Sequence, residues 1–363
     1  MRQRNRCMME LRAVLQKGFS LIFMVVLLVF FGGCGGGGED SGGAGEPVNL
    51  APQVGVGEGG GGSGQVGGEL KYFMKEDFAR HRFRVSYVSE QKDSLSQGGS
   101  EGELIKDERF EVVMRMSSME AEEANQVKLE VEAEQVALTY FGVKIDSASL
   151  VPPLEVESYP AFGDVHRALV MLSGMRFEVW VKVDRIYEVV KVIEEDTSEA
   201  VGAESEVFRY YFEKYKELFT MNVLRGAVSA AGDYLPGKEV SVGQKWDIGV
   251  MGSGLTDSFP IQTQCRLDEV LWEGDQELAW VTYAIGHLSE PETEIQIEGQ
   301  AATVKKMLMD GNGDLKYNLR EDFARDFSMK YKNTIDLLFE DASEGVLTIE
   351  EEKTFRKEII DGG

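Results

Sequence analysis

The chain has 363 residues and a formal net charge of −25 at pH 7, with 63 acidic and 38 basic side chains. A field of that sign repels phosphate backbones and anionic lipid headgroups, so we expect no nucleic acid partner. If the chain is attached to a membrane, an interaction other than electrostatic attraction must hold it there. The length is enough for one large domain or two smaller ones.

The first 33 residues have the order of an export signal. Basic residues come first, an apolar run follows from Phe19 to Phe31, and two glycines precede Cys34. The run of 13 apolar residues is shorter than the ~20 that a helix needs to cross the hydrocarbon core, which favours a cleaved signal peptide. An uncleaved transmembrane anchor is the alternative. The closing residues resemble the lipobox of bacterial lipoproteins, with Phe31 where leucine is usual. We therefore expect a signal peptide over residues 1–33 and acylation of Cys34.

Residues 34–69 are expected to form a flexible tether. Sixteen glycines fall among residues 35–69, and such a composition cannot bury enough apolar surface to order itself. A flexible chain of this length spans roughly 30–35 Å. Gly35 stands where an aspartate would resemble an inner-membrane retention signal. The expected localisation is therefore the cell envelope, lipid-anchored, at the outer membrane of a host with two membranes.

Residues 70–363 are dominated by apolar side chains that alternate with polar ones, which predicts half-buried antiparallel strands. We expect one β-rich globular domain of the α+β class, mainly antiparallel, built as a curved sheet or half-barrel packed on one long helix. The strands are predicted near residues 83–87, 110–116, 127–140, 177–183, 187–193, 263–272, 277–288, 303–309, 314–319, 335–339 and 346–351.

Two segments have helical spacing instead. Residues 162–172 predict a short helix, and residues 204–231 predict the main helix, because apolar side chains recur there every three or four positions. Pro236 cannot continue a helix and Gly237 tolerates a chain reversal, so the main helix should end before them.

A connector is predicted after this helix, in residues 234–246, which read Tyr-Leu-Pro-Gly-Lys-Glu-Val-Ser-Val-Gly-Gln-Lys-Trp. We expect Val240 and Val242 to dock an extended segment, Gly243 to turn it, and Trp246 to fill the start of a strand.

The same connector resembles the Leu-Pro…Pro-Val-x-Val-Gly-Asp-x-Trp signature of a domain-of-unknown-function family of bacterial lipoproteins. Residues 172–179, Leu-Ser-Gly-Met-Arg-Phe-Glu-Val, resemble the segment that precedes that signature. Gln244 departs from the pattern, which has aspartate there. The resemblance covers roughly residues 83–319. It implies an exported β-rich lipoprotein and brings no catalytic residue with it.

The acidic run between residues 310 and 321 allows two interpretations. Asp310, Asn312, Asp314 and Glu321 take the positions of oxygen ligands in an EF-hand-like calcium loop, but Leu315 stands where such a loop requires glycine. Asp-Gly-Asn-Gly between two strands is also a strong hairpin signal. We expect a hairpin, with a calcium site as the weak alternative.

Residues suited to catalysis are few. His81, His166 and His287 fall outside metal-binding and triad motifs, so we interpret them as surface or packing residues. Cys265 shares the parity of inward-facing strand residues, which predicts a buried, inert thiol. Because Cys7 would leave with the signal peptide and Cys34 would be acylated, we expect no intrachain disulfide. We expect no enzyme activity and no cofactor.

Trp180, Tyr283 and Ile285 are interpreted as bulky side chains opposite their apolar neighbours, and hence as a candidate hydrophobic-ligand face. Three functions follow. The first is a noncatalytic, membrane-tethered envelope lipoprotein that binds a protein or another envelope component. The second is a binder or carrier of lipid or another hydrophobic ligand, by analogy at the level of fold alone. A hydrolase comes third, because the sequence offers no nucleophile–base pair or metal cluster.

Overall fold

The structure is a computed structural model. It describes residues 71–72, 74, 81–100, 102–119, 126–149, 160–182, 188–202, 204–230, 234–253, 258–290, 292–297 and 300–360. The predicted signal peptide, Cys34 and the tether over residues 34–69 lie outside these residues.

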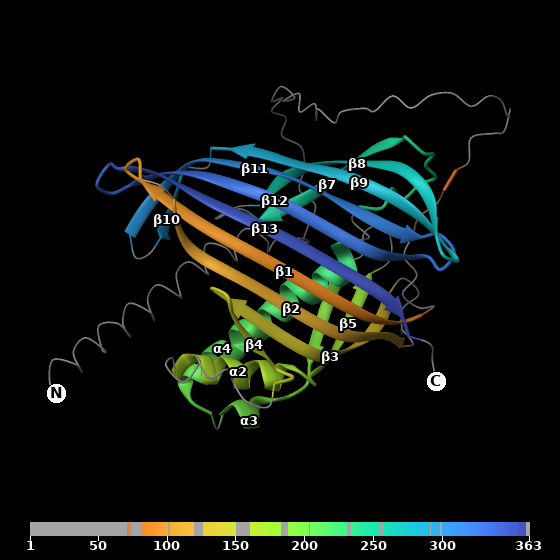
Figure 1. Cartoon of the computed structure of the whole chain (residues 1–363), viewed down its shortest axis with the longest axis horizontal. Helices are drawn as coiled ribbons and strands as arrows, with labels where there is room; N and C mark the ends of the chain where they lie inside the picture. Colours follow the sequence, from red (N-terminus) through yellow and green to blue (C-terminus); the bar gives the residue numbers. More distant parts are fainter. Residues whose placement is uncertain are drawn as a thin grey trace.

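One antiparallel sheet of thirteen strands dominates the molecule, in the order β6-β5-β3-β2-β1-β13-β12-β11-β9-β8-β7 (Figure 1). Two short strands lie off this path, with β4 paired to β3 and β10 paired to β11. The mainly antiparallel β architecture is thus confirmed. The strands are β1 Arg82–Gln97, β2 Glu103–Met119, β3 Gln126–Tyr140, β4 Val143–Asp146, β5 Arg176–Lys182, β6 Glu188–Glu194, β7 Lys245–Ser253, β8 Ser258–Glu273, β9 Gln276–Ser289, β10 Thr293–Ile297, β11 Gln300–Asn318, β12 Phe323–Phe339 and β13 Glu344–Ile359.

The first and last of these strands pair at the centre of the sheet. In the β1–β13 ladder Phe83 lies opposite Ile359, and Gln97 lies opposite Gly345. Two antiparallel runs spread outward from this ladder. We call β2, β3, β5 and β6 the first wing, and β12, β11, β9, β8 and β7 the second wing.

The chain passes from one outer edge of the sheet to the other through helices. These are α3 Ser198–Gly202 and α4 Glu206–Leu218, followed by π-helical segments at Phe219–Leu224 and Gly226–Ala230, whereas α2 Pro160–Leu172 comes earlier in the chain, between β4 and β5. Ser205 caps α4, because its hydroxyl accepts a hydrogen bond from the backbone N–H of Phe208 at 3.1 Å. The prediction of one long helix was therefore too simple: α-helical hydrogen bonding stops at Leu218, and α2 packs beside α4.

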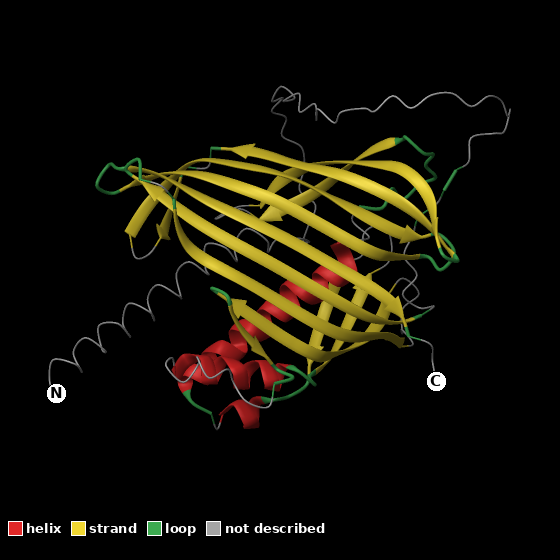
Figure 2. Cartoon of the chain, viewed as in Figure 1, coloured by secondary structure: helices red, strands yellow, loops and turns green. Residues whose placement is uncertain are grey.

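Helix α4 lies under the inner face of the sheet, which curves over it, and α2 packs beside α4 (Figure 2). Rings join the two layers on the first wing: Phe110 of β2 stacks on Tyr215 of α4 at 6.1 Å between centroids. Farther along, Phe177 of β5 meets Phe219 at 4.8 Å. Large apolar side chains buried in this way, at ~1.5–3 kcal/mol each, fix which face of each strand turns inward.

The predicted hairpin at Asp310–Gly313 is wrong. Strand β11 continues through these residues, with Gly311 paired to Tyr331 and Gly313 paired to Met329 on β12. The glycines permit close approach instead of a turn. A Cβ atom on Gly313 would lie 2.1 Å from the Ser328 carbonyl oxygen and 2.3 Å from the Tyr283 hydroxyl.

The calcium geometry fails for the same reason. Asp310, Asn312 and Asp314 alternate along one extended strand, which places the first and last of them ~13 Å apart at ~3.3 Å per residue. Glu321 lies beyond the strand and pairs with His81 at 3.0 Å. Oxygens so distributed cannot surround one ion. Within the described ranges, no group of three or more His, Cys, Asp or Glu side chains is placed to hold a metal.

Candidate functional site: a polar stripe across the inner face

Residues directly opposite each other on antiparallel strands point to the same face of a sheet, so the register shows which inner-face side chains are neighbours. One row joins Glu108 of β2, Gln91 of β1 and Glu351 of β13. The next row joins Lys106 and Asp93, and continues through Ile349 to Asn333 on β12. We call the six polar members the polar stripe: Gln91, Asp93, Lys106, Glu108, Asn333 and Glu351. All six are buried.

Gln91 connects part of the stripe by hydrogen bonds. It accepts a bond from Lys106 Nζ at 2.7 Å, and its own amide donates to both Asp93 oxygens at 2.9 and 3.1 Å. Burial raises the pKa of Asp93 from 3.8 to about 6, while Lys106 and Gln91 act in the opposite direction. The surroundings of the Asp93 carboxyl therefore disfavour its ionised form.

The two glutamates have cationic neighbours. Burial alone would raise the pKa of Glu108, but Lys214 of α4 and Lys106 outweigh it and hold that pKa below its ordinary value. Glu351 pairs with Lys353 Nζ at 3.0 Å and accepts a hydrogen bond from the Ser89 hydroxyl at 3.2 Å. Three carboxyl groups thus face three lysines.

Asn333 differs from the rest of the stripe. Its side chain is 1% exposed, and neither its amide nitrogen nor its amide oxygen has a hydrogen-bond partner in the described part of the chain. Its neighbours across the sheet are Ile349 on β13 and Met309 on β11. An orphaned buried polar group costs about 1–3 kcal/mol. A donor and an acceptor therefore stand together, unused, between apolar side chains.

Apolar surface flanks the stripe at both ends. Toward the start of β1 lies an aromatic floor, in which Phe83 meets Phe323 at 5.0 Å and Phe327 stacks on Phe355 at 5.1 Å. Toward the end of β1 lies a second set of buried side chains from β11, β12 and β13. We call this set the distal patch: Met309, Ile335, Leu337, Phe339, Leu347 and Ile349.

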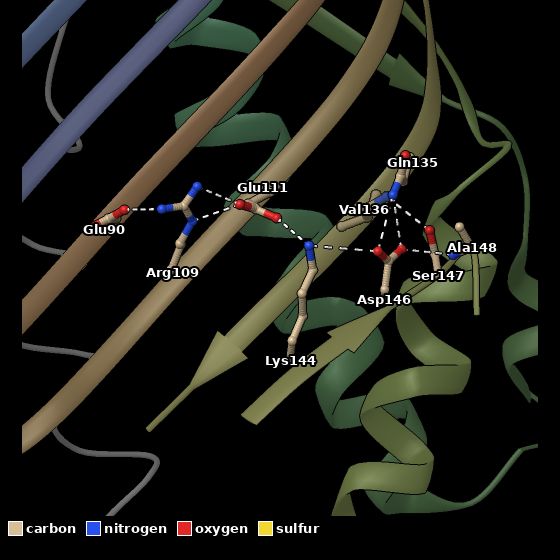
Figure 3. A network of polar contacts seen from close by, with 9 residues as sticks. All are labelled: Glu90, Arg109, Glu111, Gln135, Val136, Lys144, Asp146, Ser147 and Ala148. Atoms are coloured by element: carbon tan, nitrogen blue, oxygen red, sulfur yellow. Dashed lines mark hydrogen bonds and ion pairs between the residues drawn. The ribbon is translucent and has the colours of Figure 1, made fainter. Parts of the chain in front are cut away.

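The outer face of β1, β2 and β4 carries a different kind of polar network (Figure 3). Arg109 joins Glu90 and Glu111, and Lys144 Nζ continues the chain from Glu111 at 2.9 Å to Asp146 at 3.8 Å. Arg109 and Lys144 are about half exposed, so these ion pairs are hydrated and individually weak. They fasten β4 to the sheet, whereas the polar stripe is enclosed.

The structure does not bring Trp180, Tyr283 and Ile285 together. Trp180 lies on the outer face of β5, where Lys128 and Lys191 sit 4.8 and 5.0 Å from its ring. Tyr283 and Ile285 are buried on the inner face of β9, together with Val281. Those two were expected opposite their apolar neighbours, and that expectation was wrong.

Tyr283 has a structural role. Its ring stacks on Tyr234 of the connector at 4.2 Å, and its hydroxyl crosses Gly313 to donate to the Ser328 carbonyl oxygen. Burial raises the pKa of this phenol far above its ordinary range. The side chain therefore clamps the connector to the second wing, and its hydroxyl is committed within the protein.

The connector docks largely as predicted. Val240 is buried and forms a two-way backbone bridge with Tyr72, at 2.8 and 2.9 Å. Gly243 turns with a φ of 84°, and Trp246 is buried and donates to the Tyr234 carbonyl oxygen at 3.3 Å. Val242 is 49% exposed and does not dock, which corrects that part of the prediction.

The remaining candidates are packing residues. Cys265 is fully buried on β8, and burial raises the pKa of its thiol to about 12, as expected of an inert side chain. His166 is buried against the Ser149 carbonyl oxygen at 2.9 Å. His81 packs on Phe83 beside Glu321, which is one of the two roles expected of it.

Comparisons with known proteins assign no family. No family model and no curated protein matches the chain. A structure titled "Lipid-protein interactions in lipovitellin" overlaps 78% of this chain at 11% identity and a TM-score of 0.40, and the chain spans 25% of its length. The DynF protein of Micromonospora chersina overlaps 79% at 6% identity and a TM-score of 0.17, over 85% of its own length. Such scores assign neither family nor function.

None of the described helices has the length and apolar character to cross a membrane.

Proposed function

We propose that this protein is a membrane-tethered, noncatalytic binding protein that holds a hydrophobic ligand against the distal patch. The observation that carries the proposal is the division of the inner face. Among the described elements, α4 and the π-helical segments pack on the first wing through Phe110–Tyr215 and Phe177–Phe219, and α2 packs on β3 and β4. Gly226 lies beside Tyr87 of β1. The distal patch lies on β11, β12 and β13. Its six side chains are buried and lie away from those helix contacts, so a ligand that takes the place of their present neighbours would be held by apolar contact at ~25 cal/mol per Å².

Binding at this patch is expected to be slow. Ile335 and Leu337 are at most 2% exposed, so the end of the sheet has to open before a ligand can enter. Association that requires such a change falls below the ordinary range of about 10⁵–10⁷ M⁻¹s⁻¹.

The tether is part of the same proposal and depends on acylation of Cys34. Acyl chains contribute ~0.8 kcal/mol per buried CH₂ group, so more than one chain gives a stable anchor for an acidic protein. A protein partner stays an alternative prediction. Its natural surface is the outer face, where exposed pairs such as Lys332–Glu350, at 3.2 Å, stay hydrated.

A dye-displacement experiment tests ligand binding. Nile red should brighten in the presence of the purified protein, and hexadecane should displace it, because both are uncharged and apolar. Leu337→Gln should weaken binding of the dye, whereas Leu308→Gln on the outer face, where the side chain is 45% exposed, should leave it unchanged. Fluorescence equal to that of buffer, with the chain folded, rules the proposal out.

A further inference from the structure

The polar stripe crosses the inner face beside the distal patch, and Asn333 stands at the boundary. Along β12 the neighbouring inner-face residue beyond Asn333 is Ile335, followed by Leu337 and Phe339. From Asn333 to Phe339 the strand advances ~20 Å at ~3.3 Å per residue. A long apolar chain laid along β12 would therefore have one end at the Asn333 amide.

From this juxtaposition we infer that the ligand is an amphiphile with an uncharged head group, which binds Asn333 and carries both a hydrogen-bond donor and an acceptor. The inference rests on the proposed function and names its ligand class. A hydroxyl, a primary amide or a similar neutral group satisfies the requirement. A pure hydrocarbon leaves the amide of Asn333 without partners.

Hydrogen-bond capacity is the first argument. The amide of asparagine offers two N–H donors and one acceptor oxygen, and at Asn333 none of them is used in the described part of the chain. Both flanking inner-face residues across the sheet, Ile349 and Met309, lack a conventional hydrogen-bonding side chain. A head group placed here meets a donor and an acceptor at once, and satisfies buried polar groups that otherwise lack partners.

Charge balance is the second argument. Asp93, Glu108 and Glu351 face Lys106, Lys214 and Lys353, so the stripe needs no added ion for neutrality. Asp93 lies two strands from Asn333, ~10 Å across the sheet. Burial is the largest cause of the raised pKa of Asp93, and the same enclosure disfavours a charged head group beside it. An anionic head is therefore disfavoured.

The test compares three probes that differ only at the head: hexadecane, hexadecan-1-ol and palmitate, each measured as a competitor of Nile red at neutral pH. We expect the unsubstituted protein to bind hexadecan-1-ol about tenfold more tightly than palmitate or hexadecane, a difference of about 1.4 kcal/mol, because the hydroxyl gives Asn333 the hydrogen-bond partner that the alkane lacks. Asn333→Leu should remove the preference for the alcohol over the alkane. Asn312→Leu, on the exposed outer face of the neighbouring strand, should keep it.

The outcomes separate the two proposals. If hexadecane and hexadecan-1-ol bind equally well to the unsubstituted protein, or palmitate binds most tightly, the head-group inference is overturned while the hydrophobic site stands. If no probe binds, both fail. The comparison of probes in the unsubstituted protein needs no variant, so it decides the question even if Asn333→Leu does not fold.

Discussion

Asp93 gives the sharpest prediction, because its environment ties the stability of the fold to pH. The pKa of its carboxyl is raised from 3.8 to about 6 in the folded chain, mainly by burial. The folded state therefore holds a proton that the unfolded state has already lost between these values. The stability from this group is complete below the lower pKa and declines as pH rises through the higher one.

The magnitude follows from the size of the shift. At about 1.4 kcal/mol per pKa unit, the full difference is about 3 kcal/mol, of which about 2 kcal/mol falls between roughly pH 4.5 and pH 7.5. Asp93→Asn stays uncharged at every pH and still accepts a hydrogen bond from Gln91. Relative to this variant, the unsubstituted protein should lose about 2 kcal/mol of unfolding free energy over that interval.

Urea unfolding followed by tryptophan fluorescence measures this difference at each pH. Other carboxyl groups titrate in both proteins and largely cancel in the comparison. Glu350→Gln, an exposed position on the outer face of β13, is the matched control and should follow the unsubstituted protein. Unfolding free energies for Asp93→Asn and the unsubstituted protein that run parallel across the interval would refute the reasoning.

Three further predictions rest on single residues. Gly313→Ala should destabilise the fold by about 3 kcal/mol or more, because its methyl group would collide with Tyr283 and the Ser328 carbonyl; Gly163→Ala, with open space around it in α2, should be neutral or stabilising in the same urea assay. Cys265 should resist alkylation in native buffer and react in urea, as read by mass spectrometry of its peptide; fast native labelling would contradict its burial. Cys34→Ser should abolish incorporation of a labelled fatty acid and release the protein from the membrane fraction, and unchanged membrane association would count against the anchor.

Much of the β architecture is predictable from the sequence, because apolar alternation survives wherever the inner face is apolar. Residues 110–116 and 277–288 were predicted as strands on this basis and lie within β2 and β9. The prediction failed along the polar stripe. Gln91 and Asp93 occupy inward positions, so the alternation is lost and the second half of β1 was missed. Asn333 had the same effect on β12.

The sequence could not predict the candidate site, because its residues come from strands far apart in the chain. Asp93 and Asn333 come into one row of the sheet only through the β1–β13 and β13–β12 ladders, and a local pattern does not specify which distant strands pair. The glycines of β11 caused the opposite error, because they predicted a turn where the strand continues. Asp-Gly-Asn-Gly has the local chemistry of a turn, and only the position of Tyr283 explains why a continuous strand needs glycine there.

The ladder between β1 and β13 has a consequence for biogenesis. Each wing joins consecutive segments and can assemble as its residues become available, but the seam between the wings needs residues 82–97 and 344–359 at the same time. If the chain is exported N-terminus first, as its leader predicts, β1 has an open edge until residues 344–359 have been translocated. An open edge is a template for pairing with other chains. A chain truncated before residue 344 should therefore self-associate, which light scattering would detect, because β13 is the strand that covers this edge.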